Sequence, residues 1–311
     1  MQELAPVIAV MGPTASGKTA YAVELAERWG TEIISVDSAL VYRGLNIGAA
    51  KPDAETLKRA PHRMIDIRDP HETFSAADFA VEALPHVQEL ARNGRIPLLV
   101  GGTGLYFRAL LEGLSEMPPA DAAVRAELRA KAEQVGWQAM HAELAKVDSE
   151  SAARIHPNDP QRLLRALEIH QISGISRSQW QRQSEKPAFP YRVLRVVLSP
   201  QRREVLHERI EARFDQMLAQ GFLEEMRGLM ADPRLHPDLP SMRAVGYRQA
   251  WQHLSGNTDF STFRMQAIAA TRQLAKRQLT WFRGDVSSHW FDPQAERDTL
   301  DLCVRQFIGR T

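Results

Sequence analysis

The sequence predicts an α/β protein in which a parallel β-sheet is covered by helices on both faces and a helical segment is inserted into the chain. Two observations support this fold class. The first hundred residues alternate short apolar runs with segments of helical periodicity, as in sheets whose crossovers are helices. From about residue 121 to residue 180, helical periods continue without any strand signal. A chain of 311 residues with 44% hydrophobic and 25% charged side chains has the size and composition of about two globular domains.

The first part of the core is expected to contain four strands and two helices. The strands are the apolar runs at residues 6–10, 32–36, 63–67 and 96–100. The third run has the weakest pattern. One helix is expected at residues 19–29, where Gly30 stops it. The other is expected at residues 75–93, where Ser75 and Asp78 have the spacing of a capping box.

The middle of the chain is predicted to be helical, and the core resumes after it. The middle helices are expected at residues 121–135, 138–146 and 161–172. Residues 176–190, which contain Ser, Gln and Pro, are expected to form a mobile connection. The later core elements are a strand at 192–198, helices at 202–220, 222–230 and 262–282, and a short strand at 289–291. We therefore expect a core made of residues 1–114 and 191–311, interrupted by an inserted helical domain at residues 115–190.

Composition and the chain's first residues exclude several classes of protein. Cys303 is the only cysteine, so neither an intramolecular disulfide nor a cysteine-based zinc cluster can form, and a reducing compartment is compatible. No apolar run approaches the ~20 residues that span a bilayer, and no basic segment of a signal peptide is evident. We expect a cytoplasmic protein with no membrane partner. The net charge of +1 gives no indication of a polyanionic partner.

A phosphate-binding loop is predicted near the N-terminus. The pattern G-x-x-x-x-G-K-[ST] is matched in full by Gly12, Pro13, Thr14, Ala15, Ser16, Gly17, Lys18 and Thr19. A strand precedes this loop and a helix follows it, so backbone N–H groups and the helix N-terminus would face one anion. Lys18 would add a full charge, and the Thr19 hydroxyl could bind Mg²⁺. The fold is then a P-loop NTPase-like parallel sheet, and the ligand contains a di- or triphosphate group.

Asp37 follows the second apolar run, at the edge of the sheet where ligands bind in open α/β folds. Three roles remain open for it: a Mg²⁺ ligand, a general base, or a cap of the following turn. A later strand ends in Val100-Gly101-Gly102-Thr103-Gly104, which contains no acid. Together with the lack of a recognisable arginine finger or water-positioning residue, this favours group transfer over hydrolysis. Residues 101–104 form either a close-approach loop in which Thr103 touches a substrate or a simple tight turn.

Positive charge is concentrated in stretches that contain no acid. One covers residues 186–203, including Lys186, and another covers residues 260–284. Arg162 and Arg165 lie one helical turn apart. These stretches indicate either a surface that binds nucleic-acid phosphates or ordinary solvated helix faces. The aromatic pair at residues 281–282 is expected in the core rather than at an RNA interface.

In order along most of the chain, these motifs resemble the tRNA dimethylallyltransferases, also called tRNA isopentenyltransferases. The matching blocks are GPTASGKT at residues 12–19, DS at 37–38, VYRG at 41–44, IGAAKP at 47–52, PH at 61–62, ID at 65–66, DP at 69–70, VGGTGLY at 100–106, PNDPQRLLRALE at 157–168, AVGYRQ at 244–249 and RQLAKRQ at 272–278. The phosphate loop is shared by many families, whereas the other blocks in this order are specific.

The resemblance implies a reaction and a set of residues. The dimethylallyl group of dimethylallyl diphosphate would move to N6 of the adenosine just 3′ of the tRNA anticodon, with Mg²⁺ as cofactor and diphosphate as the leaving group. Lys18, Thr19 and Arg213 would stabilise the diphosphate, and Asp37 would accept the N6 proton. The adenosine would be extruded into a channel. By family position the contacts to the tRNA anticodon stem-loop would come from Asp37, Ser38, Ala39, Leu40, Thr103, Arg125, Gln161, Arg162, Leu163, Leu164, Arg165, Met242, Arg243, Ala244, Val245, Gly246 and Tyr247.

Two departures from the family pattern are visible. Ala39 and Leu40 stand where many relatives carry Met-Gln, so a base-reading glutamine side chain is absent there. A single cysteine cannot build the zinc-finger tail of the eukaryotic type, so the chain resembles the shorter bacterial form, which we expect to be a monomer. Three other functions remain as alternatives: an isopentenyltransferase that acts on free adenine nucleotides, a small-molecule P-loop kinase, and an RNA-binding module without chemistry.

Overall fold

The computed structural model describes residues 4–184 and 188–309. The chain divides into two compact units, which are treated separately below. The first contains Met1–Leu111 and Phe189–Thr311, and the second contains Glu112–Ala188. The sequence places these divisions after residue 114 and before residue 191. Lys186, part of one of the basic stretches, lies outside the described residues.

The first unit is built on a six-stranded sheet in which every neighbouring pair of strands is parallel. The strands are β1 (Pro6–Met11), β2 (Ile33–Val36), β3 (His62–Arg63), β4 (Leu98–Gly101), β5 (Arg192–Leu198) and β6 (His289–Phe291). Their order is β3-β2-β4-β1-β5-β6, so β1 lies inside the sheet, between β4 and β5. This arrangement confirms the predicted α/β class. It also brings the ends of β1, β2 and β4 to one edge of the sheet.

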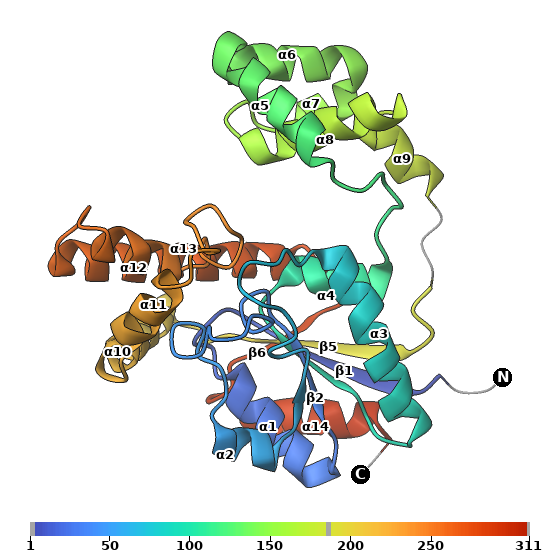
Figure 1. Cartoon of the computed structure of the whole chain (residues 1–311). Coiled ribbons are helices and arrows are strands. Elements are labelled where there is room, and N and C mark those ends of the chain that lie inside the picture. The colour runs from blue at the N-terminus through green and yellow to red at the C-terminus, as the bar shows by residue number, and fades with distance from the viewer. Residues whose placement is uncertain (1–3, 185–187, 310–311) are drawn as a thin grey trace. The chain divides into compact units, whose positions relative to one another are not determined.

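Nine helices of the described residues belong to this part of the chain. They are α1 (Lys18–Trp29), α2 (Ala54–Arg59), α3 (Ala76–Arg92), α4 (Gly104–Glu112), α10 (Arg203–Ala219), α11 (Phe222–Met230), α12 (Tyr247–Leu254), α13 (Phe260–Arg283) and α14 (Arg297–Phe307). Helices α1 and α14 cover one face of the sheet, and α3 and α4 lie across the sheet from them (Figure 1). Helices α10 to α13 pack with the loop that follows β2 in a second core.

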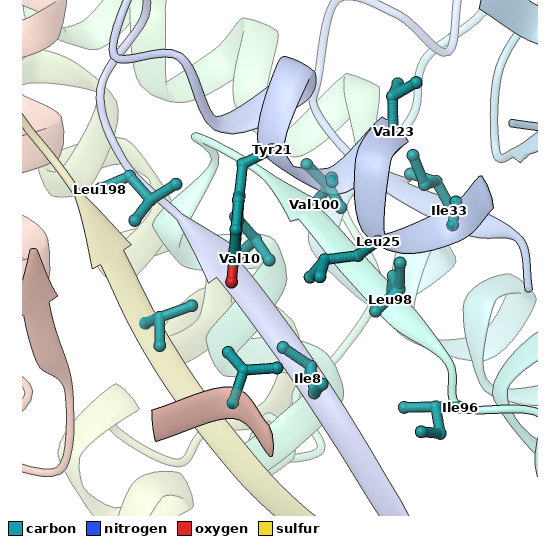
Figure 2. Close-up of a cluster of buried hydrophobic side chains, with 14 of the residues drawn as sticks. Ile8, Val10, Tyr21, Val23, Leu25, Ile33, Ile96, Leu98, Val100 and Leu198 are labelled. Carbon is teal, nitrogen blue, oxygen red and sulfur yellow. The ribbon is translucent and has the colours of Figure 1, made fainter. Parts of the chain in front are cut away.

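The core beneath α1 explains why its sequence is amphipathic. Tyr21, Ala22, Leu25 and Ala26 are buried against Ile8 and other apolar residues of the strands. Figure 2 shows Tyr21 and Leu25 of α1 among labelled side chains of the strands, including Ile8 of β1 and Leu98 of β4. Helix α1 starts where the phosphate loop ends, so burying this apolar face also fixes the loop against the sheet.

Strand β3 is shorter than the pattern at residues 63–67 predicts. It contains only His62 and Arg63. Met64 and Asp66 have positive φ angles of 63° and 55°, which an extended strand cannot contain. The hydrophobic residues of this segment therefore pack from a turn, and the strand prediction is wrong for its last four residues, 64–67.

The second unit contains only helices among its described residues. They are α5 (Ala122–Val135), α6 (Trp137–Val147), α7 (Ser149–Arg154), α8 (Pro160–Ser173) and α9 (Arg177–Gln183). Four of these helices begin at a side-chain cap: α5 at Asp121, α7 at Asp148, α8 at Asp159 and α9 at Ser176. Helix α6 has no side-chain cap. Helix α9 lies where the sequence predicts a mobile connection, so that prediction is wrong for residues 177–183. No helix in the described part of the chain combines the length and the hydropathy that crossing a bilayer requires.

Candidate active site

The phosphate loop is closed by contacts that require its glycines. Gly12 has a φ of +154°, and a Cβ atom there would lie 2.3 Å from the Leu198 carbonyl oxygen and 2.8 Å from Ser16 Oγ. Any larger residue would push the loop away from β5. Lys18 Nζ donates to the Pro13 carbonyl oxygen at 3.1 Å, so the ammonium lies over the loop. Ser16 Oγ is buried and makes no hydrogen bond within the described residues.

Gln278, which the sequence analysis does not single out, joins this loop to two other elements. Its Oε1 accepts from the Thr14 N–H at 3.0 Å, and its Nε2 donates to the Gly102 carbonyl oxygen at 3.0 Å. A Cβ atom on Gly102 would lie 2.3 Å from Nε2, so only glycine leaves room for this bridge. One side chain of α13 thus sets the distance between the phosphate loop and the loop after β4. The block at residues 272–278, which resembles the family, contains Gln278, but nothing in its pattern indicates a bridge.

Asp37 lies at the end of β2 and has one carboxylate oxygen available. Oδ1 accepts from the Ala39 N–H at 2.8 Å, which is the turn cap that the sequence allows. Oδ2 makes no hydrogen bond within residues 4–184 and 188–309. The cap and a second role, as base or metal ligand, are therefore compatible in the same side chain.

The loop after β4 approaches β2 closely. A Cβ atom on Gly101 would lie 2.0 Å from the Val36 carbonyl oxygen. Thr103 Oγ1 accepts from the Ser38 N–H at 3.1 Å, and the Thr103 N–H donates to the Val36 carbonyl oxygen at 3.2 Å. Thr103 therefore fixes the turn that carries Asp37, and it also lines the cavity.

Two cations lie near Asp37 without an ion-pair partner in the described part of the chain. Burial lowers the pKa of the Lys18 ammonium to about 8; the charge of Asp37 raises it, and the charge of Arg213 lowers it further. Burial also lowers the pKa of the Arg213 guanidinium, with Asp37 acting in the opposite direction. Two partly desolvated cations beside one carboxylate form a positive site that an anion would stabilise.

A cavity of about 580 Å³ opens onto these groups. Its walls come from the phosphate loop, the segments after β2 and β4, α10, the loop before α12, and α13. A smaller hollow of about 270 Å³ lies along residues 15–20 and shares Lys18, Thr19 and Arg213 with the larger cavity. The arrangement suits an anionic group held beside the loop and an attached organic group that extends into the larger space.

The loop at residues 46–52 forms another wall and is held by the half-buried carboxylate of Glu225. Glu225 accepts from the N–H groups of Asn46, Ile47 and Gly48 at 3.0, 2.7 and 3.2 Å. The Tyr247 hydroxyl donates to Glu225 at 2.7 Å and accepts from the Ala49 N–H at 3.1 Å. Three backbone N–H groups on one carboxylate fix this loop beside the anion site.

Most of the sequence-predicted residues of the first unit meet at this cavity. Those that line it are Thr14, Ala15, Lys18, Thr19, Asp37, Ser38, Ala39, Leu40, Thr103, Arg213, Arg243, Ala244, Val245, Gly246 and Tyr247. Ser16 and Gly17 line the smaller hollow. Gly12 and Pro13 line neither, and shape the loop instead. Met242 is fully buried in the core of α10 to α13, so its side chain does not reach the cavity.

In the second unit, the predicted arginines are already engaged by acids. Glu168, whose side chain is fully buried, pairs with Arg125 at 3.0 Å and with Arg165 at 2.8 Å. Arg162 pairs with Asp159 at 3.0 Å and is largely exposed. Leu163 and Leu164 are buried among the helices, so any contact there would come from backbone atoms, whereas Gln161 is exposed.

The arginines of the two acid-free stretches differ in their partners. In β5, Arg195 pairs with Asp285 at 2.8 Å, and Arg192 lies over the Phe307 ring at 4.6 Å, so both serve the first unit's own packing. In α13, Arg264 and Arg272 pair with acids of α10. Arg277 and its neighbour Lys276 form no ion pair within the described residues. Of the described residues in these two stretches, Arg277 lines the cavity and has no acidic partner.

The donors at the loop fit a hard divalent cation bound mainly through phosphate oxygens. Thr19 offers an exposed hydroxyl in the first turn of α1, and Asp37 offers a free carboxylate oxygen. No cluster of three or more His, Cys, Asp or Glu side chains that could hold a metal occurs in the described part of the chain. Mg²⁺ usually keeps waters and phosphate oxygens and needs only one or two protein ligands, so this sparse set suits it.

The chain is similar to known proteins in sequence and in structure. Residues 40–285 match the family described as IPP transferase. The chain is 58% identical over 307 residues to the tRNA dimethylallyltransferase of Xanthomonas axonopodis pv. citri (strain 306), covering 97% of this chain and 94% of that one. It is 39% identical to the crystal structure of the tRNA isopentenylpyrophosphate transferase of Bacillus halodurans, with a TM-score of 0.70 over 98% of this chain and 95% of that chain.

A more distant structure shares the fold. This is a eukaryotic dimethylallyltransferase that acts on tRNA, 23% identical, with a TM-score of 0.81 over 99% of this chain and 80% of that chain. The family match covers more than half of the chain, and the bacterial relatives are similar over nearly its whole length. The chain therefore belongs to the IPP transferase family, and the cavity beside the phosphate loop is its candidate active site.

Proposed function

We propose that this protein transfers the dimethylallyl group of dimethylallyl diphosphate to N6 of the adenosine just 3′ of the anticodon in tRNA. The products are N6-isopentenyladenosine and diphosphate. The proposal rests mainly on one observation. The cations Lys18, at the phosphate loop, and Arg213, in α10, lie in the same cavity as Asp37, which has one carboxylate oxygen without a hydrogen bond in the described residues. The names of the similar proteins support it. Because the acceptor is tRNA, we place the reaction in the cytoplasm.

In the proposed reaction, one bond breaks and one bond forms at C1 of the allylic group. The bond from C1 to the diphosphate oxygen breaks, and its electron pair leaves with diphosphate. The adenine N6 forms the new bond to C1, and its proton passes to Asp37. Lys18, Arg213 and the loop N–H groups stabilise the negative charge that develops on the leaving oxygen. Asp37 Oδ1 stays on the Ala39 N–H, so the free Oδ2 is the atom that accepts the proton.

We propose Mg²⁺ as the cofactor, held by Thr19 together with diphosphate oxygens. When bound, Mg²⁺ supplies positive charge to the diphosphate. Lys18 and Arg213 orient the same group from the protein side. The loop at residues 46–52, fixed by Glu225, lines the same hollow through Ala50 and Pro52.

The adenine must leave its stack to reach Asp37, because the carboxylate lies inside a cavity and not on an open surface. We propose that the cavity-lining residues of the segments 37–40 and 243–247 contact the extruded nucleotide. In the second unit, we propose that Arg162 and Gln161 contact the RNA, and that Glu168 fixes the orientation of the Arg125 and Arg165 guanidinium groups for the same purpose. We propose that the protein acts as a monomer.

The experiment that tests the proposal offers labelled dimethylallyl diphosphate and three acceptors: unmodified tRNA transcript, AMP and ATP. Label in tRNA alone supports the proposed function. Label in AMP or ATP alone would assign the chain to the isopentenyltransferases of free nucleotides. ATP consumption without label transfer would indicate a kinase. Binding of tRNA without either reaction would indicate an RNA-binding module. A transcript with guanosine in place of the target adenosine is the matched control and should accept no label.

A further inference from the structure

Helix α14 packs against α1, the helix that begins at the end of the phosphate loop. Leu300 and Val304 of α14 are buried in the same apolar cluster as Leu25 of α1. Apolar contacts hold two helices together but resist sliding and rotation only weakly, because the hydrophobic effect is non-directional. The exact position of α1 therefore depends on directional contacts. The match with the IPP transferase family ends at residue 285, before α14 begins.

Polar contacts join α14 to the beginning of α1. The Tyr21 hydroxyl donates to Asp301 Oδ1 at 3.0 Å, and Tyr21 is only 2% exposed. The other carboxylate oxygen of Asp301 accepts from Arg297 Nε at 3.2 Å. Arg297 also pairs with Glu24 of α1 and lies over the Tyr21 ring, 4.7 Å from its centroid. Both oxygens of Asp301 are thus engaged, which fixes the orientation of the tyrosine side chain.

Tyr21 is also bonded to the phosphate loop through its backbone. Its N–H donates to the Gly17 carbonyl oxygen at 3.2 Å. Lys18 and Thr19 lie in the helical turn that Tyr21 completes, so a shift of Tyr21 would move both of them. A misplacement of about 1 Å can reduce a reaction rate about a hundredfold even when it starts far from the reacting atoms. The contact with α14 therefore bears on the geometry of the anion site.

The turn that leads into α14 supports the phosphate loop at a second point. Pro293 lies against Gly17: a Cβ atom on this glycine would lie 3.8 Å from Pro293 Cγ. Asp292 accepts from the Gln201 N–H at 2.9 Å, which joins the turn to the loop that follows β5. Glu296 accepts from the Asp292 N–H at 2.7 Å and closes the turn. The segment from this turn into α14 therefore contacts both the phosphate loop and the helix that follows it.

We propose that residues 292–301 position the phosphate loop for the diphosphate, and that Tyr21 and Asp301 are the positioning residues through which they act. The inference rests on the proposed function, which makes a diphosphate the ligand of this loop. Neither side chain lines the cavity or the smaller hollow, so their effect on binding passes through Lys18 and Thr19. The network holds these two residues in place before the donor binds, which reduces the entropy that binding must remove.

The test measures the affinity for magnesium diphosphate by calorimetry, at a temperature at which every variant is folded. Tyr21→Phe keeps the ring and loses the hydrogen bond to Asp301, so its affinity should fall about fivefold to tenfold, the size of one hydrogen bond. Asp301→Ala should lose at least as much. Asp301→Asn keeps an acceptor for the hydroxyl and should recover most of that loss. Asp298→Ala, at an exposed carboxylate of the same helix, is the control and should bind as the wild type does.

A combined variant and steady-state kinetics provide further readouts. Because the two side chains act through one bond, Tyr21→Phe together with Asp301→Ala should lose no more affinity than Asp301→Ala alone. In Tyr21→Phe the KM for dimethylallyl diphosphate should rise by the same factor as the diphosphate Kd, with a smaller change in kcat and unchanged tRNA affinity. A lower Tm with unchanged diphosphate affinity would show a purely structural role and overturn the inference. Additive losses in the combined variant would also overturn it. If Asp301→Ala does not fold, Tyr21→Phe and Asp301→Asn decide.

These outcomes separate the inference from the proposed function. Diphosphate binding requires no prenyl transfer, and label transfer to tRNA by the wild-type protein is measured independently. Transfer by the wild type together with unchanged diphosphate affinity in Tyr21→Phe would contradict only the positioning role. Absence of transfer to tRNA by the wild-type protein would contradict the proposed function itself.

Discussion

Lys18 and Asp37 have opposite charges, and we propose different roles for them beside the phosphate loop. Burial alone makes the Lys18 ammonium easier to deprotonate, and Asp37 only partly offsets this. A bound diphosphate would stabilise the ammonium again, so anion binding and proton uptake by Lys18 are linked.

We predict that affinity for dimethylallyl diphosphate falls as the pH rises through about 8. Below this pH Lys18 is charged and binds the anion; above it the free protein contains the neutral amine, and binding must first add a proton. Calorimetric titration between pH 7 and pH 9.5 measures the effect. Lys18→Arg keeps its charge over this range and should show no such step, even if its affinity is lower. A step of equal size in Lys18→Arg would assign the titration to another group.

Replacing Asp37 should separate chemistry from binding. Asp37→Asn keeps an oxygen that can accept from the Ala39 N–H but cannot take a proton, so the turn should persist while transfer falls about 10³-fold. Asp37→Ala should lose transfer as well, with a much smaller change in tRNA affinity. Single-turnover transfer and filter binding of tRNA measure the two quantities. Equal losses of both would support a binding role for this carboxylate.

At the scale of elements, α13 holds the catalytic loops at a fixed spacing. Gln278 bridges Thr14 of the phosphate loop and Gly102 after β4. The same helix carries Trp281 along the cavity and Phe282 into the core. The groups that we propose for the reaction lie at the start of α1, just after β2 and in α10. Their mutual distances therefore depend on such bridges rather than on chain neighbours.

We predict that Gln278→Ala raises the KM for dimethylallyl diphosphate by about fivefold to thirtyfold, since it removes one hydrogen bond to the phosphate loop and one to the loop after β4, each worth about 1 kcal/mol. The value of kcat should fall less. Gln278→Glu keeps the acceptor for Thr14 but loses the donor to Gly102 and adds negative charge, so its KM should be raised further. Steady-state kinetics measure this split.

The control for this variant is Gln273→Ala, an exposed position on the same helix. It should leave both constants unchanged. A fall in kcat with an unaltered KM in Gln278→Ala would contradict a role in positioning the diphosphate loop.

The elements that the sequence predicts correctly are those in which pattern and packing agree. The phosphate loop, α1 and the parallel strands around β1 follow from apolar runs, a glycine motif and a capped amphipathic helix. Helix α9 was missed because its seven residues are mostly polar and only the Ser176 capping box marks it. The predicted end of β3 was wrong because the hydropathy pattern does not indicate the positive φ angles of Met64 and Asp66.

The residues of the candidate site also include some that the sequence predicts and some that it does not. Lys18, Asp37 and Thr103 could be predicted because each follows a recognisable strand or motif. Gln278 and Glu225 could not, because their partners are backbone groups more than 170 residues away in sequence. The exposure of Trp281 likewise depends on which face of α13 packs against α4, α10 and α12, and this is decided by long-range packing.

At the scale of the whole molecule, charge is nearly balanced, with a net charge of +1, and RNA binding must rely on local surfaces. Within the first unit such a surface is found at Arg243 and Arg277. In the second unit, Arg162 is the most exposed of the arginines that the family resemblance assigns to tRNA, and it is paired only with the cap of its own helix. Exposed pairs of this kind contribute little to folding, so this arginine is available for phosphate.

We therefore predict that Arg162→Ala weakens tRNA binding and reduces the dependence of log Kd on log salt by about one contact, while diphosphate affinity is unchanged. Fluorescence anisotropy with labelled tRNA at several salt concentrations measures both effects. Arg227→Ala, at an exposed arginine of α11 that pairs with Glu224, is the control and should have no effect. Loss of diphosphate affinity in Arg162→Ala would contradict this division of roles.

The most direct measurement is mass spectrometry of nuclease fragments from a tRNA transcript incubated with the protein, Mg²⁺ and dimethylallyl diphosphate, with released diphosphate assayed in the same reaction. The account predicts one added C5 group, located on the adenosine just 3′ of the anticodon, and one diphosphate for each modified tRNA; Asp37→Asn should give neither. Unmodified tRNA, or a C5 group on another nucleotide, would contradict it.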